Sequence, residues 1–337
     1  MEHKVIALDL MGGDFAPAQP LEAAWQALEH YPDIRLLLVG PRAVIAEAVA
    51  PAALQGRIEF CHAEQVIGMD DPPVQSVRQK PDASLVAGVR QLAEGRAGAF
   101  VTAGNSGAAV VAGIRLLQTL PGIERPALAV LFPGQQGETV LLDVGSQVQC
   151  RPRHLVQFAR MGAALSRHAL GVENPRIGLL NVGEEPGKGH VLARESWRRL
   201  SESGLNFVGN IEGWDLPRSR VDVAVCDGFT GNVVLKLAEG LSEFFMAVYP
   251  PLAKLPGTRH FQYIEHGGSL VLGVDGLVII THGRAQSAAI VNAIGLARRT
   301  LLGRTIEQMQ AEFKQKEDEN DRKDKRNPDG QHPGEPG

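Results

Sequence analysis

The sequence is poor in cysteine, lacks long apolar runs and has no excess of basic charge. Its three cysteines (Cys61, Cys150 and Cys226) form no CxxC pair, which excludes a disulfide framework and a cysteine zinc site and fits a reducing compartment. With a formal net charge of −4, the chain has no overall basic field to recruit nucleic acid. No run is long enough to span a bilayer and no signal-peptide pattern follows Met1, so we expect a cytoplasmic protein.

Several catalytic signatures are also missing. The sequence has no GxSxG nucleophile elbow, no HExxH motif and no HxxxxD motif of glycerolipid acyltransferases, and its ten histidines show no metal-ligand spacing. No GxGxxG follows a predicted strand, which argues against dinucleotide binding. Residues 183–189 resemble a phosphate loop, but the spacing is one residue short and Gly189 stands where serine or threonine should bind magnesium. We therefore expect no Walker-type hydrolase, no cofactor and no metal.

What the sequence does contain is an alternation of short β-branched runs with longer helical stretches. It is 44% hydrophobic and 21% charged, which is ordinary for a protein with a substantial core. The alternation predicts βαβ units in a three-layer α/β/α fold with a mostly parallel central sheet. We expect one domain over residues 1–315 and a disordered polar tail over 316–337. The expected strands are 4–9, 34–39, 57–60, 98–102, 127–131, 139–143, 176–181, 206–208, 221–226 and 277–281. The expected helices are 17–30, 41–52, 82–94, 106–118, 152–170, 190–203, 230–247, 286–301 and 304–316.

Five of these strands end in a short cluster of glycine with Asp, Asn, Ser or Thr. The clusters are residues 11–14, 104–107, 145–146, 181–183 and 227–232. In a parallel sheet all strand ends of this kind lie along one edge, and ligands of open α/β sheets bind in the crevice there. One cluster alone is explained as a turn and a helix cap. Five clusters on one edge favour a ligand site.

The chemistry of these clusters suits an anion. In residues 227–232 two glycines permit close backbone approach, and a helix start at Thr230 or Gly231 would turn unpaired N–H groups toward the crevice, an arrangement typical of phosphate sites. Ser106 repeats this logic as a helix cap. Lys188 is either a cation for the phosphate or a solvated loop lysine, and His282 is either an acid, base or phosphate donor or a structural histidine.

Two features leave alternatives open. Asp9, Asp14, Asp143 and Asp227 lie near strand ends, where they either orient donors, hold a metal or only cap helices. The apolar residues of 244–249, just before an irregular Pro- and Gly-rich segment to about residue 269, are either the core face of a helix or an exposed patch. Such a patch would meet a partner subunit, a membrane surface or an acyl chain.

Taken together, the loops resemble the acyl-carrier-protein:phosphate acyltransferase family, PlsX. The matching stretches keep their order and cover nearly all of residues 1–300. The most specific are MGGD, AGNSGA and DGFTGN. The stretches are 7–17 (ALDLMGGDFAP), 69–80 (MDDPPVQSVRQK), 102–108 (TAGNSGA), 122–129 (GIERPALA), 142–145 (LDVG), 154–159 (HLVQFA), 176–183 (RIGLLNVG), 208–213 (VGNIEG), 227–236 (DGFTGNVVLK) and 282–283 (HG).

The resemblance implies that a long-chain acyl group passes from acyl carrier protein to inorganic phosphate, giving acyl phosphate for phospholipid synthesis. It also implies a fold similar to isocitrate dehydrogenase and phosphotransacetylase, a homodimer, peripheral contact with the inner face of the membrane, and a downstream glycerol-3-phosphate acyltransferase as a partner. The candidate catalytic residues are Asn105, Lys188, Asn232 and His282. The candidate phosphate- and substrate-binding residues are Gly12, Gly13, Asp14, Gly104, Ser106, Gly107, Asn181, Gly183, Gly189, Asp227, Gly228, Phe229, Thr230, Gly231 and Lys236.

The missing nucleophile motifs agree with this reaction, because phosphate at neutral pH is already an anionic nucleophile. The protein then needs only to hold phosphate and thioester in attack geometry and to stabilise the developing oxyanion. We expect a direct displacement without an acyl-enzyme. Acyl carrier protein is acidic, so a local basic patch is needed; the candidates are Arg194, Arg198 and Arg199 on one predicted helix and Arg298, Arg299 and Arg304 on others.

The chain also departs from the family pattern. The usual NVGTExxKGN reads NVGEEPGKGH over residues 181–190, with Glu184 in place of a threonine donor, and the usual VIKxHG or VVKxHG has Ile280 in place of lysine. An extra anion near phosphate weakens its binding unless the carboxylate points away. Two alternatives follow: a phosphotransacetylase-like enzyme that uses acyl-coenzyme A, and a catalytically impaired scaffold of lipid synthesis.

Overall fold

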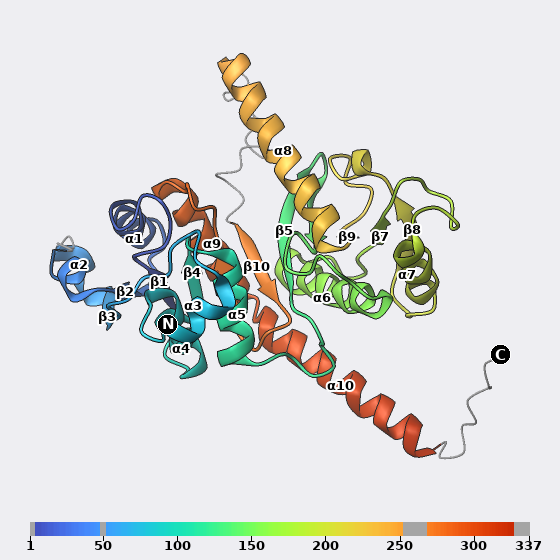
Figure 1. The fold of residues 1–337 in the computed structure, drawn as a ribbon, viewed down its shortest axis with the longest axis horizontal. Coiled ribbons are helices and arrows are strands. Elements are labelled where there is room, and N and C mark those ends of the chain that lie inside the picture. The colour runs from blue at the N-terminus through green and yellow to red at the C-terminus, as the bar shows by residue number, and fades with distance from the viewer. Residues whose placement is uncertain (1–3, 48–51, 252–267, 327–337) are drawn as a thin grey trace.

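The computed structural model describes residues 4–47, 52–251 and 268–326 (Figure 1). One sheet of 11 strands runs through both halves of the molecule in the order β3-β2-β1-β4-β11-β10-β5-β6-β9-β7-β8. The strands are β1 Lys4–Asp9, β2 Ile34–Gly40, β3 Ile58–His62, β4 Ala99–Thr102, β5 Ala127–Gly134, β6 Gly137–Leu142, β7 Ile177–Leu180, β8 Phe207–Ile211, β9 Val223–Val225, β10 Ser269–Leu272 and β11 Leu277–Ile280.

Helices pack on both faces of this sheet, while α8 and α10 also project from the body (Figure 1). The α-helices are α1 Ala18–His30, α2 Arg42–Glu47, α3 Pro73–Gln79, α4 Ser84–Ala93, α5 Ser106–Leu117, α6 Pro152–Leu170, α7 Val191–Ser201, α8 Gly228–Val248, α9 Ser287–Leu302 and α10 Thr305–Arg326. Two 3₁₀ turns, η1 Ala52–Arg57 and η2 Gly213–Asp215, complete the set of described helical segments.

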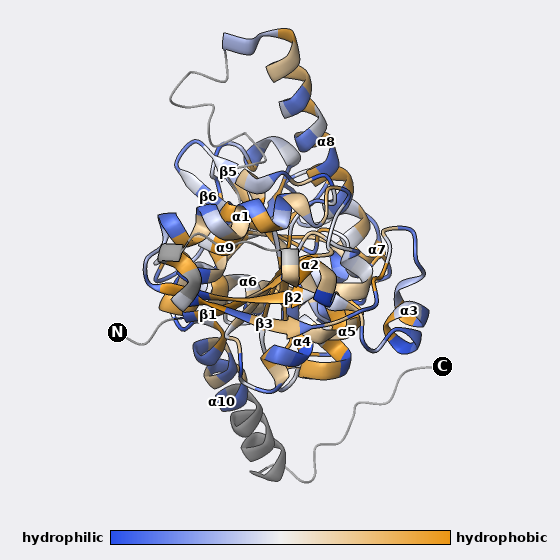
Figure 2. Cartoon of the chain, turned by 90° about the vertical axis from the view of Figure 1, so that its left-hand side faces the viewer, coloured by the Kyte–Doolittle hydropathy of each residue, from blue (hydrophilic) through white to orange (hydrophobic). Residues whose placement is uncertain are grey.

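The three-layer prediction is confirmed by the way the strands divide their side chains. Successive residues of a strand point to opposite faces, and in β1 Ile6 and Leu8 join one hydrophobic cluster while Ala7 joins the other. The first cluster takes buried residues from α1, α6, α9 and α10, and the second takes them from α4 and α5. Figure 2 shows mostly hydrophobic strands inside, with helices of mixed hydrophobic and hydrophilic residues around them.

The sheet is mostly parallel but has a reversal at its centre. β3, β2, β1, β4 and β11 run parallel to one another, and so do β6, β9, β7 and β8. Between these two sets, every pairing from β11 through β10 and β5 to β6 is antiparallel. Because three successive reversals separate them, the two parallel sets run in opposite directions.

This reversal corrects the prediction that five strand ends share one edge. The ends of β1 and β4 lie at one edge of the sheet, while the ends of β6, β7 and β9 lie at the opposite edge. The physical reason is the β5–β6 hairpin, which turns within residues 134–137 and sends β6 back along β5. The five clusters therefore form two groups and not one.

The element boundaries follow the prediction closely in most of the chain, and residues 152–170 form α6 with the expected bounds. The sequence prediction missed β10, which lies at the end of the segment judged irregular, and α3. Two prolines precede or begin α3, where the missing N–H of Pro73 costs no helical hydrogen bond. The helix expected over 41–52 ends at Glu47.

Two further expectations are corrected near the helix ends. Disorder was expected from residue 316, whereas the structure continues α10 to Arg326. This stretch is rich in Lys, Arg and Glu, which favour helix even without apolar residues. Residues 327–337 lie outside the described part of the chain.

The core-face interpretation of 244–249 is wrong, because Phe244, Phe245, Val248 and Tyr249 are 52–64% exposed. Most of the segment that follows lies outside the described residues.

Candidate active site

The candidate residues divide between two groups of loops. The first loop group, residues 11–14, 103–107 and 281–283, follows β1, β4 and β11. The second loop group, residues 143–147, 181–190 and 226–232, follows β6, β7 and β9. Within each group the parent strands are neighbours in the sheet.

The loops of the first group are packed against one another. Asp14 donates its backbone N–H to the Gly283 carbonyl oxygen at 2.7 Å. A side chain on Gly12 would lie 2.8 Å from both the Gly104 nitrogen and Thr102 Oγ1, so this approach requires glycine. Thr102 Oγ1 accepts from the Gly104 N–H at 2.9 Å and donates to buried Asp9 at 2.7 Å. The group is therefore a tightly joined unit.

Asn105 uses its side-chain amide within the protein. Its Oδ1 accepts from the Ala108 N–H at 3.0 Å and caps α5. Its Nδ2 lies 3.0–3.2 Å from the carbonyl oxygens of Gly68, Met69 and Asp71. The residue is only 6% exposed. These contacts give Asn105 a structural role, the fixing of residues 68–71 against the first loop group.

The remaining candidates of the first group have simpler surroundings. No acceptor for the backbone N–H groups of Ser106 and Gly107 occurs in the described part of the chain, so these two donors face solvent at the start of α5. His282 Nδ1 accepts from the Arg284 N–H at 3.1 Å and shapes its own loop. Gly13 has a φ of +93° beside the Gly283 carbonyl. A ligand here would be held by backbone donors.

The second loop group is anchored by Asp143. This carboxylate is fully buried and accepts from the N–H groups of Leu128, Gly145, Ser146 and Gln147 at 2.6–3.2 Å. Burial raises the pKa of the Asp143 carboxyl, against the opposing effect of these donors. Since every oxygen is occupied, Asp143 shapes the loop and is not a candidate for reaction.

The start of α8 also satisfies its own donors. Asp227 Oδ1 accepts from the N–H groups of Phe229 and Thr230 at 3.1 and 3.0 Å, and Thr230 Oγ1 donates to Oδ2 at 2.8 Å. The Gly228 N–H reaches the Gln147 carbonyl oxygen, and the Gly231 N–H reaches that of Asp227. The prediction of unpaired N–H groups here is therefore wrong, because the Asp227 carboxylate takes the place expected for an anion.

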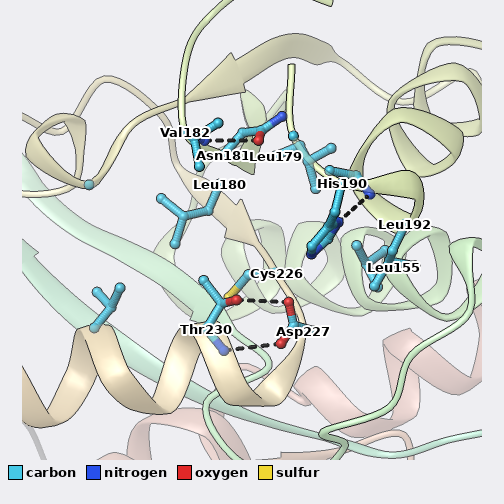
Figure 3. Close-up of a pocket in the computed structure, with 14 residues that line it drawn as sticks. Leu155, Leu179, Leu180, Asn181, Val182, His190, Leu192, Cys226, Asp227 and Thr230 are labelled. Carbon is cyan, nitrogen blue, oxygen red and sulfur yellow. Dashed lines mark hydrogen bonds between the residues drawn. The ribbon is translucent and has the colours of Figure 1, made fainter. Parts of the chain in front are cut away.

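The second loop group encloses a cavity of about 320 Å³ (Figure 3). Its wall is mainly apolar, and its side chains come from α6, β7, α7 and α8. Four of the candidate residues line it, namely Asn181, Gly189, Asp227 and Thr230. The other lining residues are Leu155, Leu179, Leu180, Val182, His190, Leu192, Ala193, Gly213, Cys226 and Val234.

The loop between β7 and α7 is closed by Asn181. Its Nδ2 donates to the Lys188 carbonyl oxygen at 3.1 Å, and its Oδ1 accepts from the Val182 N–H at 2.8 Å. Gly189 has a φ of +88° and lies so close to the Asn181 side chain and Ala193 Cβ that no side chain fits. Lys188 itself is half exposed, and its Nζ lies 3.9 Å from Glu185. This loose pairing leaves the ammonium available to an anion.

Glu184 is held by a partner outside the cavity wall. Arg220 donates to both of its carboxylate oxygens, at 2.5 and 3.3 Å, and also contacts Asp215. These hydrogen bonds lower the pKa of the Glu184 carboxyl, which is therefore ionised and paired at neutral pH. The anion that this chain has in place of the usual threonine is thus neutralised by a cation of its own.

Several predicted residues lie beside the cavity without lining it. Asn232 is exposed on α8 near Gly145, and Lys236 is paired with Glu239 at 2.8 Å. Phe229 is 63% exposed, and Gly183 is buried next to the Lys188 stem. In the described part of the chain no three His, Cys, Asp or Glu side chains gather as metal ligands.

Sequence reasoning missed His190 and Cys226. His190 precedes α7, and its Nδ1 accepts from the Ala193 N–H at 3.1 Å. The signal was the residue's position at the start of the helix predicted over 190–203, where capping side chains are common; in the structure α7 begins one residue later. Burial raises the pKa of the Cys226 thiol, whose Sγ lies 3.6 Å from the Asp143 carbonyl oxygen. Cys226 is therefore a protonated thiol and a poor nucleophile.

Comparison with known proteins agrees with this geometry. The fold is similar to a phosphotransacetylase from Streptococcus pyogenes, with a TM-score of 0.61 and 13% identity over 90% of this chain and 94% of that one. It is also similar to the EutD phosphotransacetylase from Staphylococcus aureus, with a TM-score of 0.59 and 14% identity over 88% and 94%. These likenesses show the fold, which is the expected isocitrate dehydrogenase and phosphotransacetylase type.

Sequence relatives extend the likeness. The chain is 41% identical over 328 residues to a phosphate acyltransferase of Nitratidesulfovibrio vulgaris, covering 92% of this chain and 94% of that one. It is 40% identical over 315 residues to a phosphate acyltransferase of Halothermothrix orenii, covering 88% and 94%. The family model described as fatty acid synthesis protein matches residues 4–308. The chain therefore belongs to this family, the PlsX-type phosphate acyltransferases.

Proposed function

We propose that this protein transfers a fatty acyl group from acyl carrier protein to inorganic phosphate and releases acyl phosphate. The observation that carries the proposal is the apolar cavity of the second loop group, with Lys188 directly before its lining residue Gly189 and only loosely paired. Apolar walls suit an acyl group, and a cation next to them suits the phosphate that attacks it. Membership of the phosphate acyltransferase family supports the same reaction.

The chemistry requires no nucleophile from the protein. A phosphate oxygen attacks the thioester carbonyl carbon, the C–S bond breaks, and the carrier leaves as a thiolate that takes up a proton. The only cysteine on the cavity wall is a buried, protonated thiol, which supports direct displacement over an acyl-enzyme. Trapping of an acylated Cys226 during turnover would contradict this mechanism.

The carrier protein is expected to dock beside α7. The first turn of this helix lines the cavity through Leu192 and Ala193, and Arg194 follows directly. Arg198 is shared between Glu195 and Glu202 at 3.5 Å each. Arg194 donates to the Gly189 carbonyl oxygen at 2.8 Å, but neither it nor Arg199 is paired with a carboxylate among the described residues, so these two are the more available charges. In the other candidate group, Arg298 is paired with Asp33 at 2.6 Å. Charge reversal at Arg194 should raise the KM for acyl carrier protein.

A homodimer through α8 is part of the proposal. Val233, Leu237, Leu241, Phe244 and Val248 recur every three or four residues and are 45–64% exposed, which forms one apolar stripe on a helix that projects from the body (Figures 1 and 2). A second copy of the chain would cover this stripe, and peripheral contact with the cytoplasmic face of a membrane is the competing use. No described helix is both long and apolar enough to cross a membrane. A monomer–dimer shift in Leu237→Glu, measured by sedimentation, separates these uses.

The reaction is tested by trapping acyl phosphate as its hydroxamate. Purified protein is incubated with phosphate and either a long-chain acyl carrier protein or the matching acyl-coenzyme A. We expect a phosphate-dependent hydroxamate with the carrier protein. A product with coenzyme A alone would favour phosphotransacetylase-like chemistry, and binding of the carrier without product would favour the scaffold interpretation raised by Glu184 and Ile280.

A further inference from the structure

His190 lies at the entrance to α7 with its ring in the cavity of the second loop group (Figure 3). Its Nδ1 accepts the Ala193 N–H at 3.1 Å. A ring nitrogen that accepts carries no proton, so the neutral ring has its proton on Nε2. Capping of α7 therefore fixes the tautomer and makes Nε2–H a hydrogen-bond donor.

The other polar side chains of the cavity already make hydrogen bonds within the protein. Asp227 and Thr230 bond to each other at 2.8 Å, and Asn181 bonds to the backbone of its own loop. Cys226 lies against the Asp143 carbonyl oxygen. For His190 Nε2, in contrast, no partner is found among the described residues. His190 is exposed, so its Nε2–H is open to a ligand. Leu155, Leu179 and Leu192 line the same cavity, and an apolar ligand that fills the cavity and excludes water strengthens a hydrogen bond from this donor.

We propose that His190 Nε2–H donates a hydrogen bond to the carbonyl oxygen of the acyl group and stabilises the negative charge that develops there during transfer. The ligand must bring an acceptor on an apolar group, which describes an acyl chain at its carbonyl end. A phosphate is disfavoured inside the cavity because the Asp227 carboxylate forms part of its wall. The phosphate is then held outside, by Lys188. This inference rests on the proposed function and assigns a contact residue within it.

Asparagine at position 190 is a conservative comparison. It offers both an Oδ1 to cap α7 and an Nδ2 to donate. Serine at the same position caps a helix equally well but does not reach into the cavity. The pair His190→Asn and His190→Ser therefore separates the hydrogen bond to the substrate from the cap on the helix.

The test uses the full-length protein with acyl carrier protein that bears a ¹³C-labelled acyl carbonyl. We expect H190S to unfold within a few degrees of the wild type but to lose roughly a hundredfold in kcat, the usual effect of removing one oxyanion donor, whereas H190N keeps most of it. The infrared carbonyl band of the bound donor should shift to lower frequency in the wild type and in H190N, but not in H190S. Nitrogen NMR of the free protein should show the proton of His190 on Nε2.

Two outcomes would overturn the inference. One is a carbonyl band that is the same in the wild type and H190S, and the other is a loss of kcat in H190S that H190N does not restore. The proposed function fails differently, through the absence of any phosphate-dependent hydroxamate from the wild type. Because the carbonyl band needs only binding of the acyl donor, it reports on His190 even in that case.

Discussion

The first and second loop groups are both held together by a buried aspartate, but only the second encloses a cavity. Each is anchored by a buried aspartate, Asp9 in the first and Asp143 in the second, and burial raises the pKa of both carboxyls. In the first group the loops touch one another at Gly12. In the second the 143–147 and 226–232 loops touch at Gly228, whereas a cavity lies between the 226–232 and 181–190 loops. Clusters of glycine with Asp or Asn thus predict turns reliably, but they do not say whether the turns leave room for a ligand.

The largest effect that this comparison predicts is at Lys188. Lys188→Met should lower the rate of acyl phosphate formation by about a hundredfold or more, because a preorganised cation next to the reacting phosphate is lost. Its side chain is half exposed and its Nζ is loosely paired, so the thermal midpoint should hardly change. The measurement is the hydroxamate assay beside thermal unfolding, with Lys314→Met on α10 as the matched exposed control. Full activity in K188M would remove the second loop group as the phosphate site.

In the first loop group, substitution of Asn105 should lower stability rather than activity. Asn105→Ala leaves the Ala108 N–H and the carbonyl oxygens around residues 68–71 without their partner, and we expect a loss of about 2–3 kcal/mol in the free energy of unfolding. Urea denaturation measures it. Ser106→Ala, one residue along and exposed, should change stability by no more than about 0.5 kcal/mol. If N105A kept its stability but lost activity as K188M does, the contrast between the groups would disappear.

A smaller effect is expected at the cap of α8. Asp227→Ala removes the acceptor for the N–H groups of Phe229 and Thr230 and should cost about 1 kcal/mol. Asp227→Asn keeps an acceptor at the same place and should cost clearly less. Chemical denaturation of both variants checks this, and equal losses would show that the charge rather than the cap matters at this helix start.

The smallest effect concerns Asp71, in the segment 68–71 that Asn105 fixes against the first loop group. The hydrogen bond from Lys80 at 2.6 Å lowers the pKa of Asp71 below its usual 3.8, and Asp71 also accepts the Gly68 N–H. A lowered carboxyl pKa contributes stability that is present above pH 3.8 and is lost as the pH falls through the folded value. The stability difference between wild type and Asp71→Asn should therefore be constant at neutral pH and shrink below about pH 3.8. A difference that grows on acidification would contradict this assignment.

Several residues of the candidate site could be predicted from the sequence. The candidates Asn181, Gly189, Asp227 and Thr230 come from local patterns at strand ends, and the structure puts these four on one cavity wall. His190 was missed because a histidine before a helix carries no distinctive signal of chemistry. The free N–H groups expected after β9 were wrong because Asp227 reaches back to bond them, which depends on side-chain geometry and not on residue type.

The direction of the strands was also not predicted from the sequence, although one signal of the sheet reversal was present. The strands expected at 127–131 and 139–143 are joined by too few residues for a parallel crossover, which needs a dozen or more, so a hairpin was predictable. β10 gave no comparable signal, because its four residues follow a segment without periodicity. Only the pairing of β10 with β5 and β11 reveals that three antiparallel steps separate the two parallel sets.

The sequence by itself determined most of the helices and strands, the three-layer architecture and the family, because periodicity, caps and ordered motifs are local properties of the chain. The tertiary structure alone decided that the strand ends form two loop groups at opposite edges of the sheet and that the second encloses the cavity. Strand direction depends on which distant strand supplies the hydrogen bonds, and a cavity depends on how side chains from α6, β7, α7 and α8 meet. Neither is recorded in any single stretch of residues.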